Sequence, residues 1–173
     1  VGCSKDTPEP SPPAGEKLIA DPIVEKAIRD RLNKPEGGLT KADLEKVTAL
    51  TLGGNKFSDA GLKDAAKLQN LEWLYMYDTQ ITDAGLKDVA KCTQLTSLNL
   101  GRTKITDAGL KELAKLQKLT TLDLMRTKIT DAGLKDVAKL QKLTDLHLSY
   151  TQVTDAGVAE LQKALPNCFI LGP

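Results

Sequence analysis

Apolar residues recur along this chain in a unit of 24 residues. Each unit begins with a strand-like spacing of apolar residues and continues with a helix-like spacing. The first part of the unit reads apolar-x-x-apolar-x-apolar, and its alternation predicts one apolar face of a short β-strand. The second part carries apolar residues at helical spacing, as in Leu110, Leu113, Ala114 and Leu116. The strand pattern occurs at Val47, Leu50 and Leu52, at Leu71, Leu74 and Met76, at Leu95, Leu98 and Leu100, at Leu119, Leu122 and Leu124, and at Leu143, Leu146 and Leu148.

A second string, Ile-Thr-Asp-Ala-Gly-Leu or a close variant, follows each strand pattern in the same register. Its copies begin at Phe57, Ile81, Ile105, Ile129 and Val153. The Thr or Ser hydroxyl can cap a helix, and the Asp suits the positive end of the helix dipole. Each unit is therefore predicted to hold a strand, a turn and a helix. One unit cannot bury its apolar face alone, so the five units are predicted to stack as a solenoid.

On these repeated strings, from roughly residue 20 to residue 173, the chain resembles the leucine-rich repeat family. Its Ile-Thr-Asp-Ala-Gly-Leu variant is similar to bacterial repeats related to the cysteine-containing subclass. The resemblance implies an α/β fold, a right-handed solenoid with a curved parallel β-sheet on the concave face, helices on the convex face and a helical N-terminal cap. The family's usual Asn after the strand is present only as Asn55. A threonine ladder is expected to close the other turns, at Thr79, Thr103, Thr127 and Thr151.

The two ends of the chain differ from the repeats. Residues 1–16, rich in Pro, Ser, Glu and Lys, are predicted to be a disordered tether. Asp21 followed by Pro22 predicts a helix start, and Thr40 predicts a second short helix through Lys46. We therefore divide the chain into a tether at 1–16, a helical N-terminal cap at 17–46, five repeats at 47–163 and a C-terminal cap strand at 164–173.

Cys3 is the cysteine that bears on localisation. The string Val1-Gly2-Cys3-Ser4 is similar to the tail of a bacterial lipobox, in which a small residue precedes the cysteine that is lipidated. We expect lipidation at Cys3, secretion through a removed signal peptide, and a location at the cell envelope or surface. A membrane would then be contacted only through this lipid anchor. The alternative is that the sequence simply begins at a stretch that includes a cysteine.

The other two cysteines are expected to belong to the core. Cys92 stands in the slot that Leu68, Leu116 and Leu140 hold in other repeats, and Cys168 is expected to be buried too. Three repeats at roughly 4.8 Å each separate Cys92 from Cys168, which is beyond the roughly 7 Å between bridged Cα atoms. We expect no disulfide between them, no metal site and no cofactor.

The residues between and just after the strand leucines are expected to point to the concave face. They include the single Trp, all three Tyr and the single His of the chain, whereas both Phe residues fall at positions expected to be structural. Solvent-facing aromatic and Arg side chains are typical of interfaces. Alternatively, the aromatics pack along the sheet. The candidate partner-binding residues are Trp73, Tyr75, Tyr77, Asp78, Asn99, Arg102, Asp123, Met125, Arg126, His147 and Tyr150.

These residues favour a non-catalytic module that binds a protein, with a carbohydrate ligand or a passive structural role in the envelope as alternatives. The net charge of +1 gives no bulk attraction to nucleic acid, and Asp78, Asp123 and Asp145 argue against a phosphate-binding stripe. His147 with Asp123 or Asp145 could form part of a catalytic dyad. Its only nucleophiles would be Ser149 or Ser97 on a shallow surface, so we expect no enzyme. We also expect a monomer.

Lysines recur on the predicted helices, at Lys63, Lys87, Lys111 and Lys135. Each is followed directly by an acidic residue: Asp64, Asp88, Glu112 and Asp136. We interpret them as a solvated convex face whose field is mostly cancelled.

Overall fold

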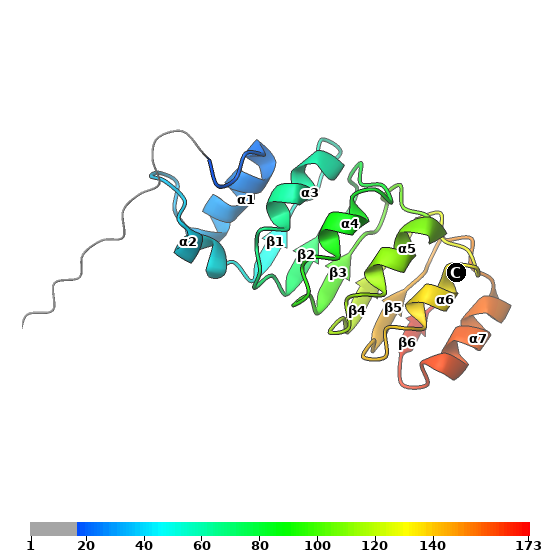
Figure 1. The fold of residues 1–173 in the computed structure, drawn as a ribbon. Helices are drawn as coiled ribbons and strands as arrows, with labels where there is room; N and C mark the ends of the chain where they lie inside the picture. The colour runs from blue at the N-terminus through cyan, green and yellow to red at the C-terminus, as the bar shows by residue number, and fades with distance from the viewer. Residues whose placement is uncertain (1–16) are drawn as a thin grey trace, which may run out of the picture.

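Six short parallel strands form one sheet in chain order in the computed structural model, which describes residues 17–173 (Figure 1). Helices cover one side of this sheet, so the predicted stack of strand–helix units is confirmed. The strands are β1 (Ala49–Thr51), β2 (Trp73–Tyr75), β3 (Ser97–Asn99), β4 (Thr121–Asp123), β5 (Asp145–His147) and β6 (Phe169–Leu171). The helices are α1 (Pro22–Leu32), α2 (Lys41–Glu45), α3 (Asp59–Ala65), α4 (Leu86–Val89), α5 (Asp107–Leu113), α6 (Leu134–Val137) and α7 (Asp155–Ala164).

The core is an aliphatic column between the sheet and the helices. The central Leu of each of the first five strands is buried, and the strand residues on either side of it face away from the core. Leu116, predicted to be helical, lies beyond the end of α5 but is fully buried. Cys92 and Cys168 are buried free thiols, as expected for core positions. Burial raises the pKa of each thiol to about 11, Asp88 adding to the shift at Cys92 and Asp145 at Cys168.

The predicted threonine ladder closes the turns after β2, β3, β4 and β5. The Thr103 hydroxyl donates a hydrogen bond of 2.7 Å to the carbonyl of Leu100, three residues earlier. Thr79, Thr127 and Thr151 make the same bond to Met76, Leu124 and Leu148. Thr79, Thr103 and Thr127 are buried, so each bond satisfies polar atoms that water does not reach.

A second ladder joins neighbouring repeats, and its role differs from the one predicted. The carboxylate of Asp83 accepts hydrogen bonds from the backbone N–H of Thr106 at 2.7 Å and from its hydroxyl at 2.6 Å. The capping bond from Ala108 N–H to the Thr106 hydroxyl is longer, at 3.3 Å. We call the Asp–Thr contact the clasp. It recurs between Asp59 and Thr82, Asp107 and Thr130, and Asp131 and Thr154.

The clasp explains the glycine of the repeated string. A Cβ placed on Gly109 would lie closer than 3.0 Å to a carboxylate oxygen of Asp83 and to the side chain of Leu86. The same crowding holds at Gly85, Gly133 and Gly157, each against the Asp of the preceding repeat. The Asp of one unit and the Gly of the next are therefore a single packing feature, although 26 residues separate Asp83 from Gly109 in the sequence.

The helices predicted before the first repeat are present, and they lie against its exposed end (Figure 1). Asp21 caps α1 by accepting bonds from Ile23 N–H and Val24 N–H, and Asn33 ends it in a left-handed conformation. Thr40 and Asp43 form a capping box on α2. Hydrogen bonds from Lys34 and Thr40 lower the pKa of Asp43 from 3.8 to about 2.

Asp64 of α3 anchors this N-terminal segment to the first repeat. Its carboxylate accepts the backbone N–H groups of Ala20 at 2.7 Å and Asp21 at 2.6 Å, and the Lys67 ammonium lies 2.6 Å away. Burial raises the pKa of Asp64, but the hydrogen bonds from Lys67, Asp21 and Ala20 outweigh burial and leave the pKa below its ordinary value of 3.8. Asp64 is thus a structural anchor rather than part of the solvated face assumed from the sequence.

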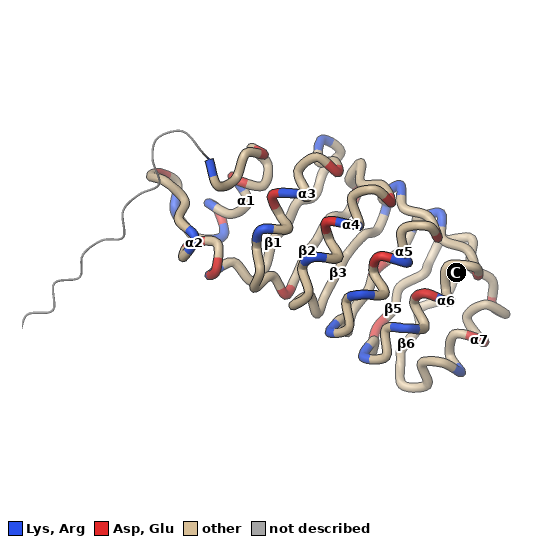
Figure 2. The backbone as a smooth tube through the Cα atoms, in the orientation of Figure 1, with Lys and Arg blue, Asp and Glu red and all other residues tan. Residues whose placement is uncertain are grey.

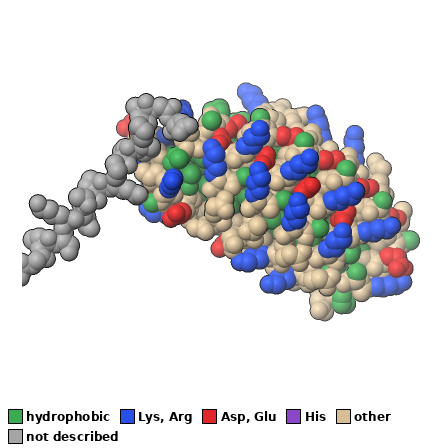
Figure 3. Space-filling model, viewed as in Figure 1, with side chains coloured by type: hydrophobic (Ala, Val, Ile, Leu, Met, Phe, Trp, Pro, Cys, Tyr) green, Lys and Arg blue, Asp and Glu red, His purple; other side chains and the backbone are tan. Residues whose placement is uncertain are grey.

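The helical side of the molecule carries lysines and acidic residues in alternation (Figures 2 and 3). The acidic residues pair with the lysine three positions later, not with the lysine directly before them. These pairs, each at 2.6 Å, are Asp64–Lys67, Asp88–Lys91, Glu112–Lys115 and Asp136–Lys139. Within residues 17–173, no helix is long and apolar enough to cross a membrane. The predicted tether at 1–16 and Cys3 lie outside the described residues.

Gly109→Ala should lower the free energy of unfolding by about 1–3 kcal/mol, because the methyl group forces Asp83 out of its clasp with Thr106. Urea unfolding measures the change. Gly38→Ala is the matched control, since nothing lies within 4 Å of a Cβ built there. Equal effects of the two substitutions would show that the clasp does not require glycine.

Asp64→Asn should lower the free energy of unfolding at pH 7 by about 2 kcal/mol, because the Ala20 and Asp21 N–H groups lose a charged acceptor. The folded-state pKa of Asp64 is depressed, so its stabilisation is present above pH 3.8 and is lost as the pH falls below that value. The stability difference between wild type and variant should therefore shrink in acid. Urea titrations at pH 7 and below pH 3.8 measure it, with Asp30→Asn at an exposed ion pair as the control. A difference that does not change with pH would rule out this role.

Candidate functional site

Strand register sets outward-facing side chains of successive repeats side by side in two rows. Each residue of one strand pairs with the residue 24 positions later, so like positions form lines across the sheet. The first row is Ala49, Trp73, Ser97, Thr121, Asp145 and Phe169. The second row is Thr51, Tyr75, Asn99, Asp123, His147 and Leu171.

A third line of side chains follows the turn after each strand, and we call it the corner row. Its members are Gly54, Asp78, Arg102, Arg126 and Tyr150, again 24 residues apart. All five have left-handed backbones, with φ of 107°, 59°, 56°, 54° and 60° in that order. This conformation costs roughly 1–2 kcal/mol for a residue with a Cβ. The two rows and the corner row together are called the sheet face.

Aromatic side chains on the sheet face are exposed to different degrees. Trp73 is 61 % exposed, Tyr75 43 % and Tyr150 71 %. Tyr77 is half-buried, because its ring lies over Gly101, where a Cβ would come within 2.9 Å of it. The rings of Tyr75 and Tyr77 are 6.1 Å apart. Trp73, Tyr75 and Tyr150 therefore present apolar area to solvent, whereas Tyr77 also packs within the face.

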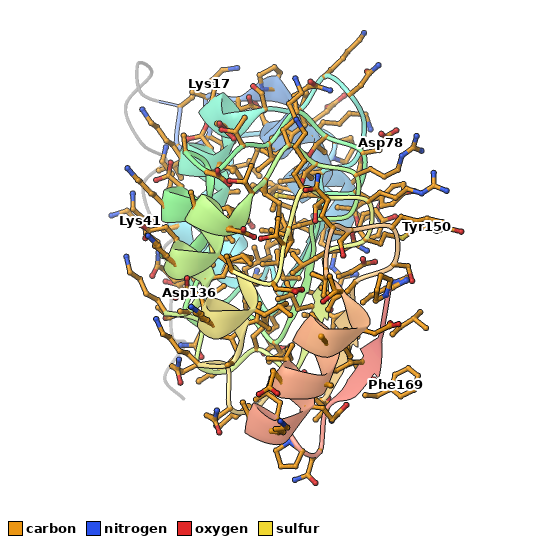
Figure 4. All side chains as sticks on the ribbon, turned by 90° about the vertical axis from the view of Figure 1, so that its right-hand side faces the viewer. Lys17, Lys41, Asp78, Asp136, Tyr150 and Phe169 are labelled. Atoms are coloured by element: carbon orange, nitrogen blue, oxygen red, sulfur yellow. The ribbon has the colours of Figure 1, made fainter. Side chains whose placement is uncertain are left out.

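The prediction that both Phe residues are structural is wrong for Phe169. Phe57 is fully buried, but Phe169 is 68 % exposed and Leu171 is 47 % exposed on β6. Counting 24 residues on from Asp145 and His147 reaches these two positions, so the repeat period contained the signal. Figure 4 shows Phe169, Tyr150 and Asp78 projecting from one side of the molecule and Lys41 and Asp136 from the other. The sheet face therefore extends to the last strand.

Polar side chains in the middle of the second row bond to one another. Asn99 donates a 2.8 Å hydrogen bond to Asp123, and His147 Nδ1 lies 3.7 Å from the other oxygen of that carboxylate. The backbone N–H groups of Gly101 and Met125 donate to Asn99 and Asp123. The predicted proximity of His147 and Asp123 is confirmed. These bonds hold Asn99 and Asp123 in fixed orientations at the centre of the sheet.

The two arginines of the corner row are placed by aromatic neighbours. The Arg126 guanidinium lies over the Tyr150 ring, 4.8 Å from its centroid, and Arg102 lies 5.8 Å from that of Tyr77. Arg102 Nε is also 3.7 Å from a carboxylate oxygen of Asp78. Asp78 and Tyr150 therefore flank the two arginines in the corner row.

A shallow depression of about 410 Å³ opens on the sheet face over β1 to β4. Trp73 and Tyr75 line it from β2, and Asn99 and Asp123 line it from β3 and β4. Ser149 lies outside it and donates a hydrogen bond to the carbonyl of Gly172. In residues 17–173, no group of three or more His, Cys, Asp or Glu side chains is arranged to hold a metal ion. The shallow, partly aromatic surface over β1 to β4 is suited to binding a ligand through a broad contact area.

Two family models match the repeated part of the chain. The model described as "Leucine Rich repeats (2 copies)" matches residues 69–115, and the model described as "Leucine Rich repeat" matches residues 115–138 and 139–161. The two models together cover residues 69–161, which is more than half of the chain. A search of curated proteins found no significant match.

Solved structures with a similar fold include proteins of two bacteria. An internalin from Listeria monocytogenes aligns with a TM-score of 0.52 and 23% identity, over 88% of this chain and 56% of its own. A leucine-rich repeat protein of Leptospira interrogans aligns with a TM-score of 0.51 and 24% identity, over 74% of this chain and 38% of its own. The present chain therefore spans little more than half of the first structure and less than half of the second.

Proposed function

Because the chain belongs to the leucine-rich repeat family, we propose that it is a non-catalytic binding module whose sheet face takes a protein ligand. Proteins of this family are generally protein-interaction modules, which supports a protein partner. The observation that carries the proposal is the exposure of Trp73 and Tyr75 next to each other on β2. Trp and Tyr dominate the energetics of many interfaces, and their apolar area remains in water until a partner covers it.

The charges of the sheet face support a protein rather than a nucleic acid. Arg102 and Arg126 stand on the corner row, but Asp123 and Asp145 lie on the strands beside them. A nucleic acid would bring its phosphates close to these carboxylates, which repel them. A mixed surface with aromatic side chains and Arg is typical of protein interfaces.

A carbohydrate ligand is the second candidate. The depression over β1 to β4 brings Trp73 and Tyr75 together with Asn99 and Asp123, and such a set can stack on a sugar ring and bond its hydroxyls. The mutual hydrogen bond of Asn99 and Asp123 occupies part of their capacity and makes this candidate the weaker one. A passive structural role in the envelope would leave the aromatic surface without a use.

A photo-crosslinking experiment tests the protein ligand. A photoreactive phenylalanine analogue replaces Tyr75 on the sheet face or, as matched control, Lys111 on the exposed side of α5. Irradiation in cell lysate and in extracellular protein should give discrete adducts from position 75 alone. Trp73→Ala in the same chain should remove them, while the free energy of unfolding changes by only about 0.5 kcal/mol because Trp73 is exposed.

Two results would count against the proposal. Equal adducts from positions 75 and 111 would mean that the sheet face is not selective. A large loss of stability in Trp73→Ala would mean that the aromatics serve the fold. Adducts to glycans in place of proteins, seen as glycosidase-sensitive species, would favour the carbohydrate candidate.

We further propose that the module is monomeric and is held at the bacterial cell envelope by a lipid on Cys3. The support is the lipobox-like string Val1-Gly2-Cys3-Ser4, since a cysteine after a small residue is the acceptor of that modification. Similar folds in two bacterial proteins are compatible with a bacterial source.

Expression of the chain behind a lipoprotein signal peptide tests the anchor. Wild type should fractionate with membranes and give an N-terminal peptide whose mass includes acyl chains, whereas Cys3→Ser should be released. Cys92→Ser is the control, because that thiol is buried and should not affect membrane association. An unmodified Cys3 in the membrane-free fraction would exclude the anchor.

A further inference from the structure

The corner row carries large side chains at positions where the backbone favours glycine. Arg102, Arg126 and Tyr150 all have φ near 55–60°, a region in which Asn, Asp and Gly are the usual residues. Gly54 occupies the same position in the first repeat, so the turn itself does not need a side chain. Arg102, Arg126 and Tyr150 are also exposed, so they add no buried packing in return. Residues held in a strained backbone conformation, with no gain in packing, indicate a role in function rather than in stabilising the fold.

The choice of arginine rather than lysine narrows that role. The chain has only four arginines, Arg29, Arg31, Arg102 and Arg126, and the exposed cations on α3 to α7 are all lysines. A guanidinium is planar and offers paired N–H donors that match the two oxygens of a carboxylate, whereas an ammonium is a point charge. Two of the four arginines standing in adjacent repeats of one exposed row therefore suggest recognition of a planar anion.

Neighbouring side chains hold both guanidinium groups but leave donors available. Tyr150 supports Arg126 from one face, and Tyr77 supports Arg102. Only Nε of Arg102 approaches Asp78, at 3.7 Å. Among residues 17–173, neither guanidinium donates a hydrogen bond to a protein acceptor. Arg102 contacts Tyr77 of the second repeat, and Arg126 contacts Tyr150 of the fifth. Their backbones belong to adjacent repeats, roughly 4.8 Å apart, so both side chains are long enough to turn toward one anion.

The rest of the sheet face indicates which anion fits. Asp123 and Asp145 lie on the strands beside the corner row, and Asp78 precedes the arginines in the row itself. A polyanion would approach these carboxylates, but a single carboxylate at the corner would not. Tyr75 and Trp73 continue from the corner along β2 and offer apolar contact to whatever adjoins that carboxylate.

We propose that Arg102 and Arg126 form a carboxylate-binding site that takes an Asp or Glu side chain of the protein ligand, next to an apolar residue that contacts Tyr75. This site rests on the proposed function of the sheet face and adds the chemistry of the partner. The occupant is an acidic-apolar peptide segment, and charge complementarity at the corner row selects it.

Side-chain NMR of the whole chain tests the site with a defined probe. The probe is the blocked peptide acetyl-Leu-Glu-Glu-Leu-amide, and its matched control is acetyl-Leu-Gln-Gln-Leu-amide. The Nε–Hε signals of Arg102 and Arg126 should shift and saturate with the Glu peptide, and the Gln peptide should bind at least about tenfold more weakly. Arg31, on α1 before the first repeat, is the internal control and should not shift.

Arg102→Gly combined with Arg126→Gly separates binding from folding. Glycine suits the left-handed backbone at both positions, so the midpoint of thermal unfolding should not fall, while affinity for the Glu peptide should drop by about tenfold or more. Replacing both residues by Lys keeps the charge but should still weaken binding, because the paired donors are gone.

Three results would overturn the site: no saturable shift with the Glu peptide, unchanged affinity in the double Gly variant, or inorganic phosphate binding as tightly as the Glu peptide. These outcomes are independent of the crosslinking test. Adducts at position 75 without peptide binding would leave the proposed function intact and remove the carboxylate site. Peptide binding without adducts at position 75 would leave the carboxylate site intact and count against the proposed function.

Discussion

The clasp between an Asp of one repeat and a Thr of the next is the contact on which the rest of the structure depends. It ties each repeat to its neighbour through two hydrogen bonds to one carboxylate, on the helical side of the stack. The same carboxylate presses against the following glycine, so the helices can approach only in one alignment. That alignment carries through each unit to the strands, where like positions pair 24 residues apart. The clasp on the helical side and the strand pairing on the sheet side thus repeat with the same 24-residue period.

Fold and face make different demands on the same 24-residue unit. Positions that face the core or the clasp hold nearly the same residue in every repeat, since each must satisfy the same neighbours. Positions on the sheet face differ from repeat to repeat, and there the molecule departs from what the fold alone favours. Exposed Trp73 and the left-handed backbone at Arg126 are two such departures. Trp73 lies on strand β2, and Arg126 lies in a turn that the Thr127 hydroxyl closes by a hydrogen bond to Leu124. A ligand would therefore meet side chains on hydrogen-bonded backbone, which lowers the entropy cost of binding.

The sequence alone was enough to predict the period, the strand–helix unit, the threonine ladder and the candidate face, because each follows from local spacing. It was not enough for contacts between repeats. The Asp of the repeated string looked like a helix-dipole residue, and only the stack shows Asp83 bonded to Thr106. Asp64 looked solvent-facing, yet the segment around Ala20 covers it. Phe169 was expected to stand at a structural position, although the register with Asp145 places it on the exposed sheet face. The left-handed backbone of the corner row is typical of Gly54 and Asp78, but nothing in Arg102, Arg126 or Tyr150 predicts it.

The uniform clasp also makes the repeats interchangeable as building blocks. Thr106 and Gly109 would meet an equivalent carboxylate whether the unit before them were the second or the fourth, so a whole unit could be lost or duplicated without breaking the ladder. The corner row is less tolerant, because loss of the third or fourth unit would delete Arg102 or Arg126, and a unit inserted between them would separate the two arginines. A change of array length by whole units therefore preserves the clasp, whereas a change at the third or fourth unit alters the surface that the corner row presents. A duplicated 24-residue unit keeps the clasp contacts of its parent, so the residues on its sheet face can change without loss of those contacts.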